Sequence, residues 1–521
     1  MQDSTSNRSV SSQSRPQCQT CVKRSKHCYG YREEVDLIFC DQNELIGRKV
    51  RETRKAHKYI GTPDLPIDPN NSNDRPSDSL LLAESSGSRE NSTLLSRRPL
   101  VSSSEPNISK IQLDVPDREQ ALSLFFHQYV ALGDADGEIP GFNDTFPVFY
   151  RQALPNSCMK HCVAATAYAS LANQSQSLAV SRKTWEAYGT ALSSVNTALA
   201  DPAEALKDET LCAIFVLGMF ENITAKQSQA FGVHGCGLDR LLHLRGKQQF
   251  ETEYGEQVSR AVCTFLQIRN LSLERQPPPH EEYWFMNVRG CVPYRRVMSS
   301  VSRICRVRAA AKELLTNIDN SPFEDSGASL SAHCAALTDL VAEMQLVNSN
   351  HWLWVEGASS VWSYSAVLVP RLSINRRSHP DEAVHIYHNL WIANLWNWTR
   401  TSCILLQNTI LKCLRKLSSI SLEQLPNHDT IEANAKETIK SIIRDICASL
   451  PFLMGDIDSQ GNVIETSQRF GYCGQSMAQL WLLWHFRVMS TSGFALPHQL
   501  ILIKETCYRI GYGKGIMQAV L

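Results

Sequence analysis

Apolar residues recur at the three- and four-residue spacing of an amphipathic helix through most of the chain after Asp117. Alternating polar and apolar runs of strand length are scarce, and no repeat of 20–50 residues is apparent. The pattern therefore predicts an all-α domain over residues 116–521. Its clearest helical segments are Leu122–Val130, Leu211–Phe220, Ala383–Leu414, Thr438–Leu450, Gln475–Met489 and Gln499–Ile510.

Several helix ends in this region carry local start and stop signals. Asp201 followed by Pro202 offers an N-cap side chain and a proline at the first helical position. Gly246 follows a helical pattern at the position where glycine commonly ends a helix. Three prolines at 277–279 interrupt the chain, and a further helix is predicted from about Val297 to Leu315. The segment Leu211–Phe220 is apolar on most sides, which predicts a central helix.

The first 115 residues have a different character. Residues 61–115 hold six prolines among Asn, Asp, Ser and Arg, and they contain few large apolar side chains. Such a segment cannot bury enough apolar surface to offset the entropy of ordering it. We interpret it as a disordered linker between the helical domain and a small head at residues 1–60.

Charge and cysteine content place constraints on partners and compartment. The chain of 521 residues has no formal net charge, but residues 1–60 contain 12 Lys or Arg against 7 Asp or Glu. A basic head of this kind suits an anionic partner, although a solvated tail is the alternative. Of the seventeen cysteines, the thirteen after Cys40 are scattered, many in apolar stretches, and no signal peptide or membrane-length apolar run is apparent. These features favour reduced thiols, an intracellular location and no membrane partner.

The sequence contains no constellation typical of an enzyme. It lacks a Gly-x-Ser-x-Gly elbow, a His-Glu-x-x-His pair and a phosphate-binding loop that ends in Gly-Lys-Ser or Gly-Lys-Thr. Weaker candidates have structural interpretations. We expect a hydrogen-bonded histidine at His234, glycines that allow helices to pack at Gly235–Gly237, and a helix-ending turn at Gly511–Gly515. We also expect a turn-forming pair of aspartates at Asp134–Asp136 and core packing of Trp354, Trp391 and Trp396. We therefore expect a protein that is not an enzyme, with an all-α enzyme as the least favoured alternative.

One stretch of the head does suggest specific chemistry. Cys18, Cys21 and Cys28 are separated by two and then six residues, a spacing that brings thiolates within reach of one zinc ion. Three basic side chains lie between these cysteines, and a bound metal would hold them close together. Such cations contact DNA phosphates without reading the base sequence. The predicted phosphate contacts are Lys23, Arg24 and Lys26.

The segment from Arg15 to Phe39 resembles the second half of the six-cysteine binuclear zinc cluster of fungal transcription factors. The remainder is similar to the all-helical regulatory domain of that family. The stretches that carry the second likeness are Tyr168–Asn173, Tyr188–Leu192, Ala198–Pro202, Asp208–Glu221, His234–Gly235, Leu241–Leu242, Arg245–Phe250 and Ile510–Ala519. The resemblance covers nearly all of the chain except the linker, and it implies a zinc cofactor, DNA as a partner and a nuclear location.

The chain departs from the family pattern at its DNA-reading end. In the family, a first cysteine triplet on a basic helix precedes this segment, whereas residues 1–14 here contain no cysteine. Two zinc ions that share six thiolates cannot form from three cysteines alone. The alternatives are a single zinc completed by His27, Cys40 or water, an unfolded remnant, or a cluster completed by an upstream segment.

The resemblance implies a transcription regulator of the fungal zinc-cluster type, and control of a secondary-metabolite gene cluster is a further expectation. The helical domain would control activation and receive a small molecule or a partner in a helix-lined groove. The alternative is an interaction protein that does not bind DNA and acts through protein partners. The partners that the resemblance implies are DNA, transcription machinery or co-regulator proteins, and a second copy in a homodimer.

Overall fold

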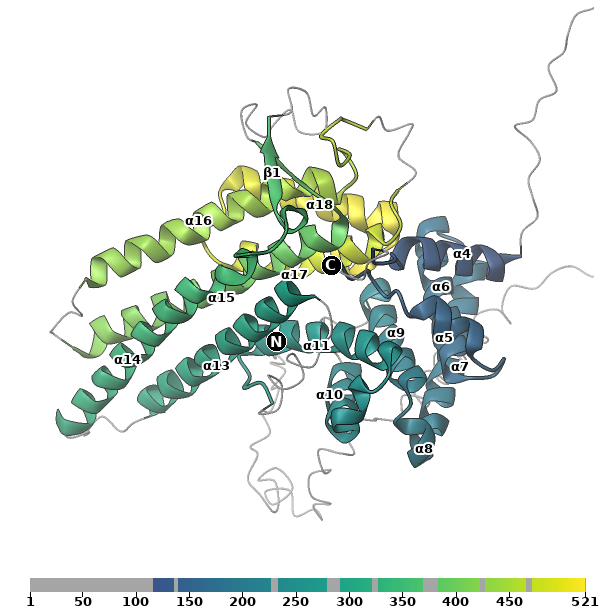
Figure 1. The fold of residues 1–521 in the computed structure, drawn as a ribbon, viewed down its shortest axis with the longest axis horizontal. Coiled ribbons are helices and arrows are strands. Elements are labelled where there is room, and N and C mark those ends of the chain that lie inside the picture. The colour runs from purple at the N-terminus through teal and green to yellow at the C-terminus, as the bar shows by residue number, and fades with distance from the viewer. Residues whose placement is uncertain are drawn as a thin grey trace, which may run out of the picture. The chain divides into compact units, whose positions relative to one another are not determined.

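A computed structural model of the chain describes residues 116–134, 139–225, 233–278, 291–320, 327–368, 383–421, 427–464 and 471–520. These residues form fourteen α-helices, short 3₁₀ turns and one two-stranded sheet (Figure 1). The prediction of an all-α domain is therefore confirmed. The 3₁₀ turns are η2 (Gly246–Phe250), η3 (Leu353–Val355), η4 (Ser360–Trp362) and η6 (Met517–Val520).

The first group of helices packs around α9 (Asp208–Thr224), which is buried without a break from Thr210 to Glu221. The apolar run in this helix was predicted to be central, and that prediction is confirmed. Tyr188 stacks on Phe220 with ring centroids 4.2 Å apart, and the Thr166 hydroxyl donates to the backbone oxygen of Val216. The other helices of the group are α4 (Asp117–Tyr129), α5 (Phe146–Gln152), α6 (Cys158–Ser175), α7 (Leu178–Ala200) and α8 (Pro202–Ala205).

The helix-end signals near Pro202 and Gly246 mark real boundaries. The Asp201 side chain accepts the backbone N–H of Ala203, as predicted for an N-cap, although α8 is only one turn long. The next helix, α10 (Val233–Arg245), ends at Gly246, whose φ of +56° suits glycine. Helix α11 (Glu253–Leu273) then ends before the prolines at 277–279.

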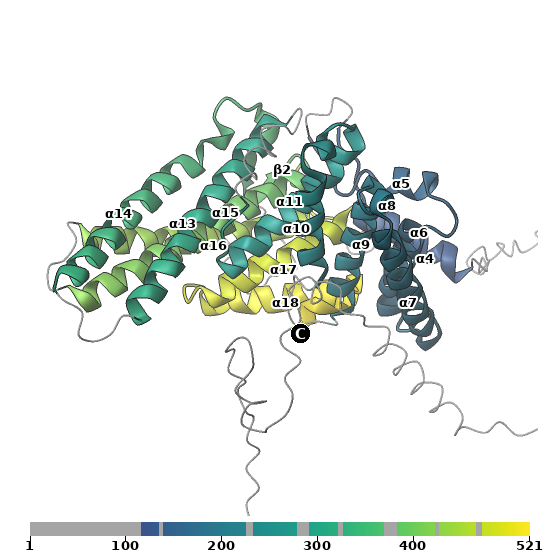
Figure 2. The same ribbon diagram turned by 90° about the horizontal axis from the view of Figure 1, so that it is seen from below.

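Four long helices run side by side on the other side of α11 (Figures 1 and 2). Helix α15 contacts the other three, and most of its residues are buried, because it lies between neighbours rather than at the edge of a layer. Its apolar stripe is therefore broad, and polar side chains on it need partners inside the protein. The four helices are α13 (Val292–Asn320), α14 (Gly327–His351), α15 (Leu390–Ile420) and α16 (His428–Leu453).

A short antiparallel hairpin precedes α15, and there the prediction of a helix from Ala383 is wrong. Strand β1 (Tyr364–Val367) pairs with β2 (Val384–Tyr387). The second strand is Val-His-Ile-Tyr, rich in β-branched and aromatic side chains that suit a pleated, buried surface. Helix α15 starts only after Asn389, whose side chain accepts the backbone N–H of Ile392 as an N-cap.

The last two helices connect the C-terminal part of the chain with the first group. Helix α17 (Gln475–Thr491) packs against α4, and α18 (Pro497–Lys514) packs against α6. Side chains of α6 cap the end of α18, because the Asn173 amide donates to Gly515 O at 2.8 Å and the Gln174 amide donates to Lys514 O at 2.9 Å. Gly515 ends α18 with φ +70°, as predicted for a helix-ending glycine, whereas Gly511 lies inside the helix rather than in a turn.

The thirteen cysteines among the described residues are all free thiols. Burial raises the pKa of Cys403 to about 12 and that of Cys413 to about 11, so both remain protonated at neutral pH. This agrees with the prediction of buried thiols, which behave as small apolar side chains. No helix in the described part of the chain is long and apolar enough to cross a membrane.

Candidate functional site

The residues predicted to bind zinc and DNA lie outside the part of the chain that the structure describes. The same holds for the linker at 61–115 and for the completing ligands His27 and Cys40. Their roles remain predictions from the sequence. The residues concerned are Cys18, Cys21, Cys28, Lys23, Arg24 and Lys26.

Within the described residues, a groove of about 850 Å³ lies between the start of α13 and the end of α14. We call it the arginine groove, because three of its wall residues are arginines on α13. The wall is formed by Val292, Arg295, Arg296, Ser299, Ser300 and Arg303 from α13, and by Val347, Asn350, Leu353, Trp354, Glu356 and Gly357 from the end of α14 and the turn after it.

The helical repeat places the arginines on the groove face of α13. Arg296 and Arg303 are seven residues apart, or about two turns, and Ser299 and Ser300 lie between them on the same face. The next residues along the helix, Val297 and Ile304, are completely buried. One amphipathic helix therefore supplies both a core face and a cationic wall.

The floor of the groove is apolar and includes a tryptophan with an unused donor. Trp354 is 2% exposed and Val347 is 4% exposed. The Trp354 ring packs against Trp396 of α15 with centroids 4.9 Å apart, so core packing, the role expected from the sequence, is part of what it does. Its indole Nε1–H is buried and has no hydrogen-bond acceptor among the described residues.

A buried histidine links the groove wall to α15. The Nε2 atom of His351 lies 2.9 Å from Thr399 O, and because a carbonyl can only accept, Nε2 carries the proton. Its Nδ1 atom then accepts from the Ser300 hydroxyl at 2.7 Å. Burial lowers the pKa of His351 to about 4, which keeps this ring neutral at physiological pH.

The groove floor is also connected to a buried arginine, Arg400, through Trp396. Trp396, which packs on Trp354, also lies 5.3 Å from the guanidinium carbon of Arg400. Arg400 is 1% exposed and donates to the Tyr387 hydroxyl at 2.6 Å and to Asn397 Oδ1 at 2.9 Å. These contacts join the groove floor, α15 and the β1–β2 hairpin through side chains that touch.

A second buried arginine, Arg308, lies further along α13 at the end of α11. It donates through Nη1 to Leu405 O and the Thr409 hydroxyl, and through Nη2 to Leu271 O at 3.3 Å and Glu274 Oε1 at 3.1 Å. We call this group the Arg308 cluster. Because a helix C-terminus carries partial negative charge and unpaired carbonyls, a cation is well placed there.

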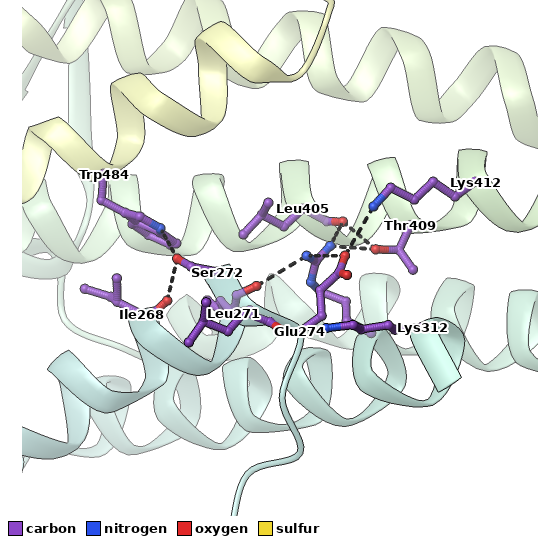
Figure 3. Close-up of polar contacts among 11 residues, drawn as sticks. Ile268, Leu271, Ser272, Glu274, Lys312, Leu405, Thr409, Lys412 and Trp484 are labelled. Atoms are coloured by element: carbon purple, nitrogen blue, oxygen red, sulfur yellow. Dashed lines mark hydrogen bonds and ion pairs between the residues drawn. The ribbon is translucent and has the colours of Figure 1, made fainter. Parts of the chain in front are cut away.

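Neighbouring side chains complete the Arg308 cluster (Figure 3). Lys412 of α15 binds the Glu274 carboxylate at 3.2 Å, and Lys312 of α13 donates to Leu273 O at 3.1 Å. From α17, the Trp484 indole donates to Ser272 Oγ at 2.9 Å. The end of α11 is therefore held by three other helices, α13, α15 and α17.

Among the described residues, the group with the side chains of a metal site is His428, Asp429 and Glu432 at the start of α16. Each carboxylate already has a cationic or imidazole partner, since Glu432 pairs with Lys436 at 2.7 Å and Asp429 contacts His428 at 3.2 Å. The Asp429 side chain is 90% exposed. We interpret this group as a surface ion-pair network.

His234, the histidine singled out in the sequence, has a structural role. Its Nε2 atom lies 3.3 Å from Glu221 Oε1 of the central helix α9. Gly235, the next residue, leaves room for the Arg269 side chain, whose Cδ would lie 3.3 Å from an added Cβ. Both observations agree with the predictions of a hydrogen-bonded histidine and a packing glycine.

The fold and the groove define an all-α domain that offers a cationic, ligand-sized surface and is otherwise closely packed. Residues 139–420 match the family model of the fungal specific transcription factor domain, and the chain belongs to this family. No curated protein and no solved structure matches the chain. The family identifies the chain as a fungal transcription regulator, which confirms the resemblance of its helical part.

Sequence reasoning missed the arginine groove, although the sequence contained a signal for it. Arg296 and Arg303 have the spacing of one helix face and alternate with the apolar core positions of the same helix. What the sequence does not show is that the end of α14 lies opposite and supplies Val347 and Trp354 as a floor. A basic helix face alone is also typical of a solvated surface.

Proposed function

We propose that this protein is a nuclear transcription regulator in which the helical domain controls the activity of a DNA-binding head at residues 1–60. The observation that carries the proposal is the family domain at 139–420 in the same chain as a basic, cysteine-containing head. In this proposal Cys18, Cys21 and Cys28 bind zinc, and the basic residues between them contact phosphates. A protein with this role needs no catalytic site.

The phosphate contacts predict a change in the salt dependence of DNA binding. In the full chain, the triple variant Lys23→Gln/Arg24→Gln/Lys26→Gln should weaken binding and reduce the slope of log K against log salt by about 3, because each phosphate contact contributes about 0.9. Gel shifts with zinc, on duplexes selected from a random library, measure this slope.

Two further variants make the DNA-binding result specific. Cys21→Ser and addition of a chelator should both abolish binding, whereas Lys440→Gln, which removes an exposed lysine of α16, should leave it unchanged. The zinc hypothesis is wrong if the chelator has no effect on sequence-dependent binding.

The second candidate function is a regulator that does not bind DNA and acts through protein partners. The specific observation in its favour is that Cys18, Cys21 and Cys28 alone cannot hold the two zinc ions of a complete binuclear cluster. In the gel-shift experiment this candidate predicts no chelator-sensitive, sequence-dependent binding by the purified chain. Retention of transcriptional control in cells by the Cys21→Ser variant would support it over the first proposal.

We also propose that the regulated genes form a biosynthetic cluster for a secondary metabolite, on the basis of the family resemblance alone. Deletion of the gene should change the transcript levels of a contiguous set of biosynthetic genes, and reintroduction of the wild-type gene should restore them. Transcriptome sequencing of the deletion strain and the complemented strain measures this. Changes scattered over unlinked genes would contradict the proposal.

A further inference from the structure

We propose that the arginine groove binds a small organic anion with a planar apolar body. The further statement that this ligand is an effector of the regulator rests on the proposed function. The proposal that the ligand binds rests on the groove alone.

The charge of the groove favours an anion. Its described lining contains three arginines and one carboxylate, that of Glu356. Neither Arg296 nor Arg303 has an ion-pair partner among the described residues, and Arg296 donates to the backbone oxygen of Glu356 at 2.7 Å. Arg296 and Arg303 are both exposed residues that line the groove. A guanidinium also matches a carboxylate, phosphate or sulfonate in a bidentate geometry.

The floor of the groove favours an apolar, flat body on that anion. Trp354 and Val347 present a buried surface, and Leu353 adds an aliphatic side chain that is 43% exposed at the rim.

The size of the groove fits a small molecule. A volume of about 850 Å³ lies within the usual range of about 300–1,000 Å³ for ligand sites. The site is also connected to the helical core, because Ser300 contacts His351, which bonds to α15, and Trp354 contacts Trp396. A ligand that touches Ser300 or Trp354 therefore contacts the same side chains that position α15.

The test uses the purified full chain and 1-anilinonaphthalene-8-sulfonate, a fluorescent probe with a sulfonate on a planar aromatic body. The double variant Arg296→Gln/Arg303→Gln should raise the Kd of the probe at least tenfold, because both lost cations face the groove. The matched control is Lys440→Gln/Arg444→Gln on α16, which removes the same charge from exposed side chains and should change Kd less than twofold.

Two further probes separate the anion from the apolar body. N-phenyl-1-naphthylamine, which lacks the sulfonate, should bind at least tenfold more weakly than the sulfonated probe, and equally to the wild type and the arginine double variant. Inorganic phosphate should compete with the sulfonated probe only at millimolar concentration, because it has no surface to place on the floor. Trp354→Phe should raise the probe Kd several-fold, with circular dichroism to confirm an unchanged fold.

The proposal is overturned if the arginine double variant binds the sulfonated probe as the wild type does, or if the uncharged probe binds equally well. A transcription reporter in cells distinguishes this result from failure of the proposed function. An inactive wild-type reporter together with arginine-dependent probe binding would contradict the proposed regulatory function and support ligand binding in the arginine groove. An active reporter with probe binding that does not depend on the arginines would contradict ligand binding in the arginine groove and support the proposed regulatory function.

Discussion

Glu274→Gln is expected to lower the free energy of unfolding by about 3 kcal/mol, because it leaves the buried Arg308 guanidinium without a negatively charged partner. Arg308 is 4% exposed, and Glu274 is the only carboxylate that it contacts among the described residues. Glutamine has nearly the same shape and can occupy the same backbone conformation, so the change isolates the charge. Urea denaturation followed by circular dichroism at 222 nm measures the loss.

The loss of unfolding free energy in Glu274→Gln arises from the desolvation of the Arg308 charge rather than from the strength of the ion pair itself. Burial already lowers the pKa of Arg308, which shows that the surroundings disfavour its charged form, and Glu274 opposes this effect. Once the carboxylate is removed, only neutral acceptors remain, namely Leu271 O, Leu405 O and the Thr409 hydroxyl. The end of α11 would then be held less firmly against α13 and α15.

A double-mutant cycle checks this explanation. Arg308→Met should also destabilise the protein, and Arg308→Met/Glu274→Gln should cost less than the sum of the single changes, because the two side chains share one interaction. Lys412→Gln is the control: its side chain is 50% exposed, so its ion pair with Glu274 should contribute at most about 1 kcal/mol. Additive effects of the two core substitutions would show that the ion pair is not what stabilises the cluster.

The sequence predicted the helices well because their signals are local. The apolar run in α9, the Asp201 cap and the glycines at positions 246 and 515 act within a few residues of themselves. The strand at Val384–Tyr387 was missed because a short apolar segment before a helix has no clear period of its own, and its partner β1 lies outside that window.

The buried arginines could not be predicted in the same way. Arg308 and Arg400 look like ordinary charges on helices until the neighbouring elements are placed around them. The partners of Arg308 come from positions 271–274 and 405–409, more than thirty and about one hundred residues away. Tyr387 and Asp445 approach Arg400 from a strand and from another helix. Only the tertiary packing makes these charges interior, and the groove beside Trp354 arises from the same packing.

Acid should destabilise the helical domain well before most of its carboxyl groups become protonated. Burial lowers the pKa of His234, His351 and His385 to about 4 and that of His485 to about 3, with Arg400 adding to the effect at the last two. In the unfolded chain each histidine has a pKa near 6.5, so between about pH 6.5 and 4 the unfolded state binds more protons. Stability is therefore complete above pH 6.5 and falls as the pH drops through this window.

The two completely buried rings, His351 and His485, should account for much of this loss. Each should contribute about 2 kcal/mol to the fall in unfolding free energy between pH 7.5 and pH 5, because burial lowers the pKa of His351 to about 4 and that of His485 to about 3. His351 faces only the neutral groups Ser300 and Thr399 in its hydrogen bonds, and His485 bonds to Thr401. Urea denaturation at the two pH values measures the difference.

The double variant His351→Gln/His485→Gln separates these histidines from all other titrating groups. It should be less stable than the wild type at pH 7.5, because each substitution disturbs buried packing, but its stability should fall by about 4 kcal/mol less on going to pH 5. His243→Gln, which removes an exposed imidazole from the last turn of α10, is the control for loss of a histidine outside the core. An unchanged pH dependence in the double variant would mean that these rings accept protons in the folded state. The hydrogen bond from His351 Nε2 to α15 would survive such protonation, and the one between Nδ1 and Ser300 would reverse its direction, because the serine hydroxyl can accept as well as donate.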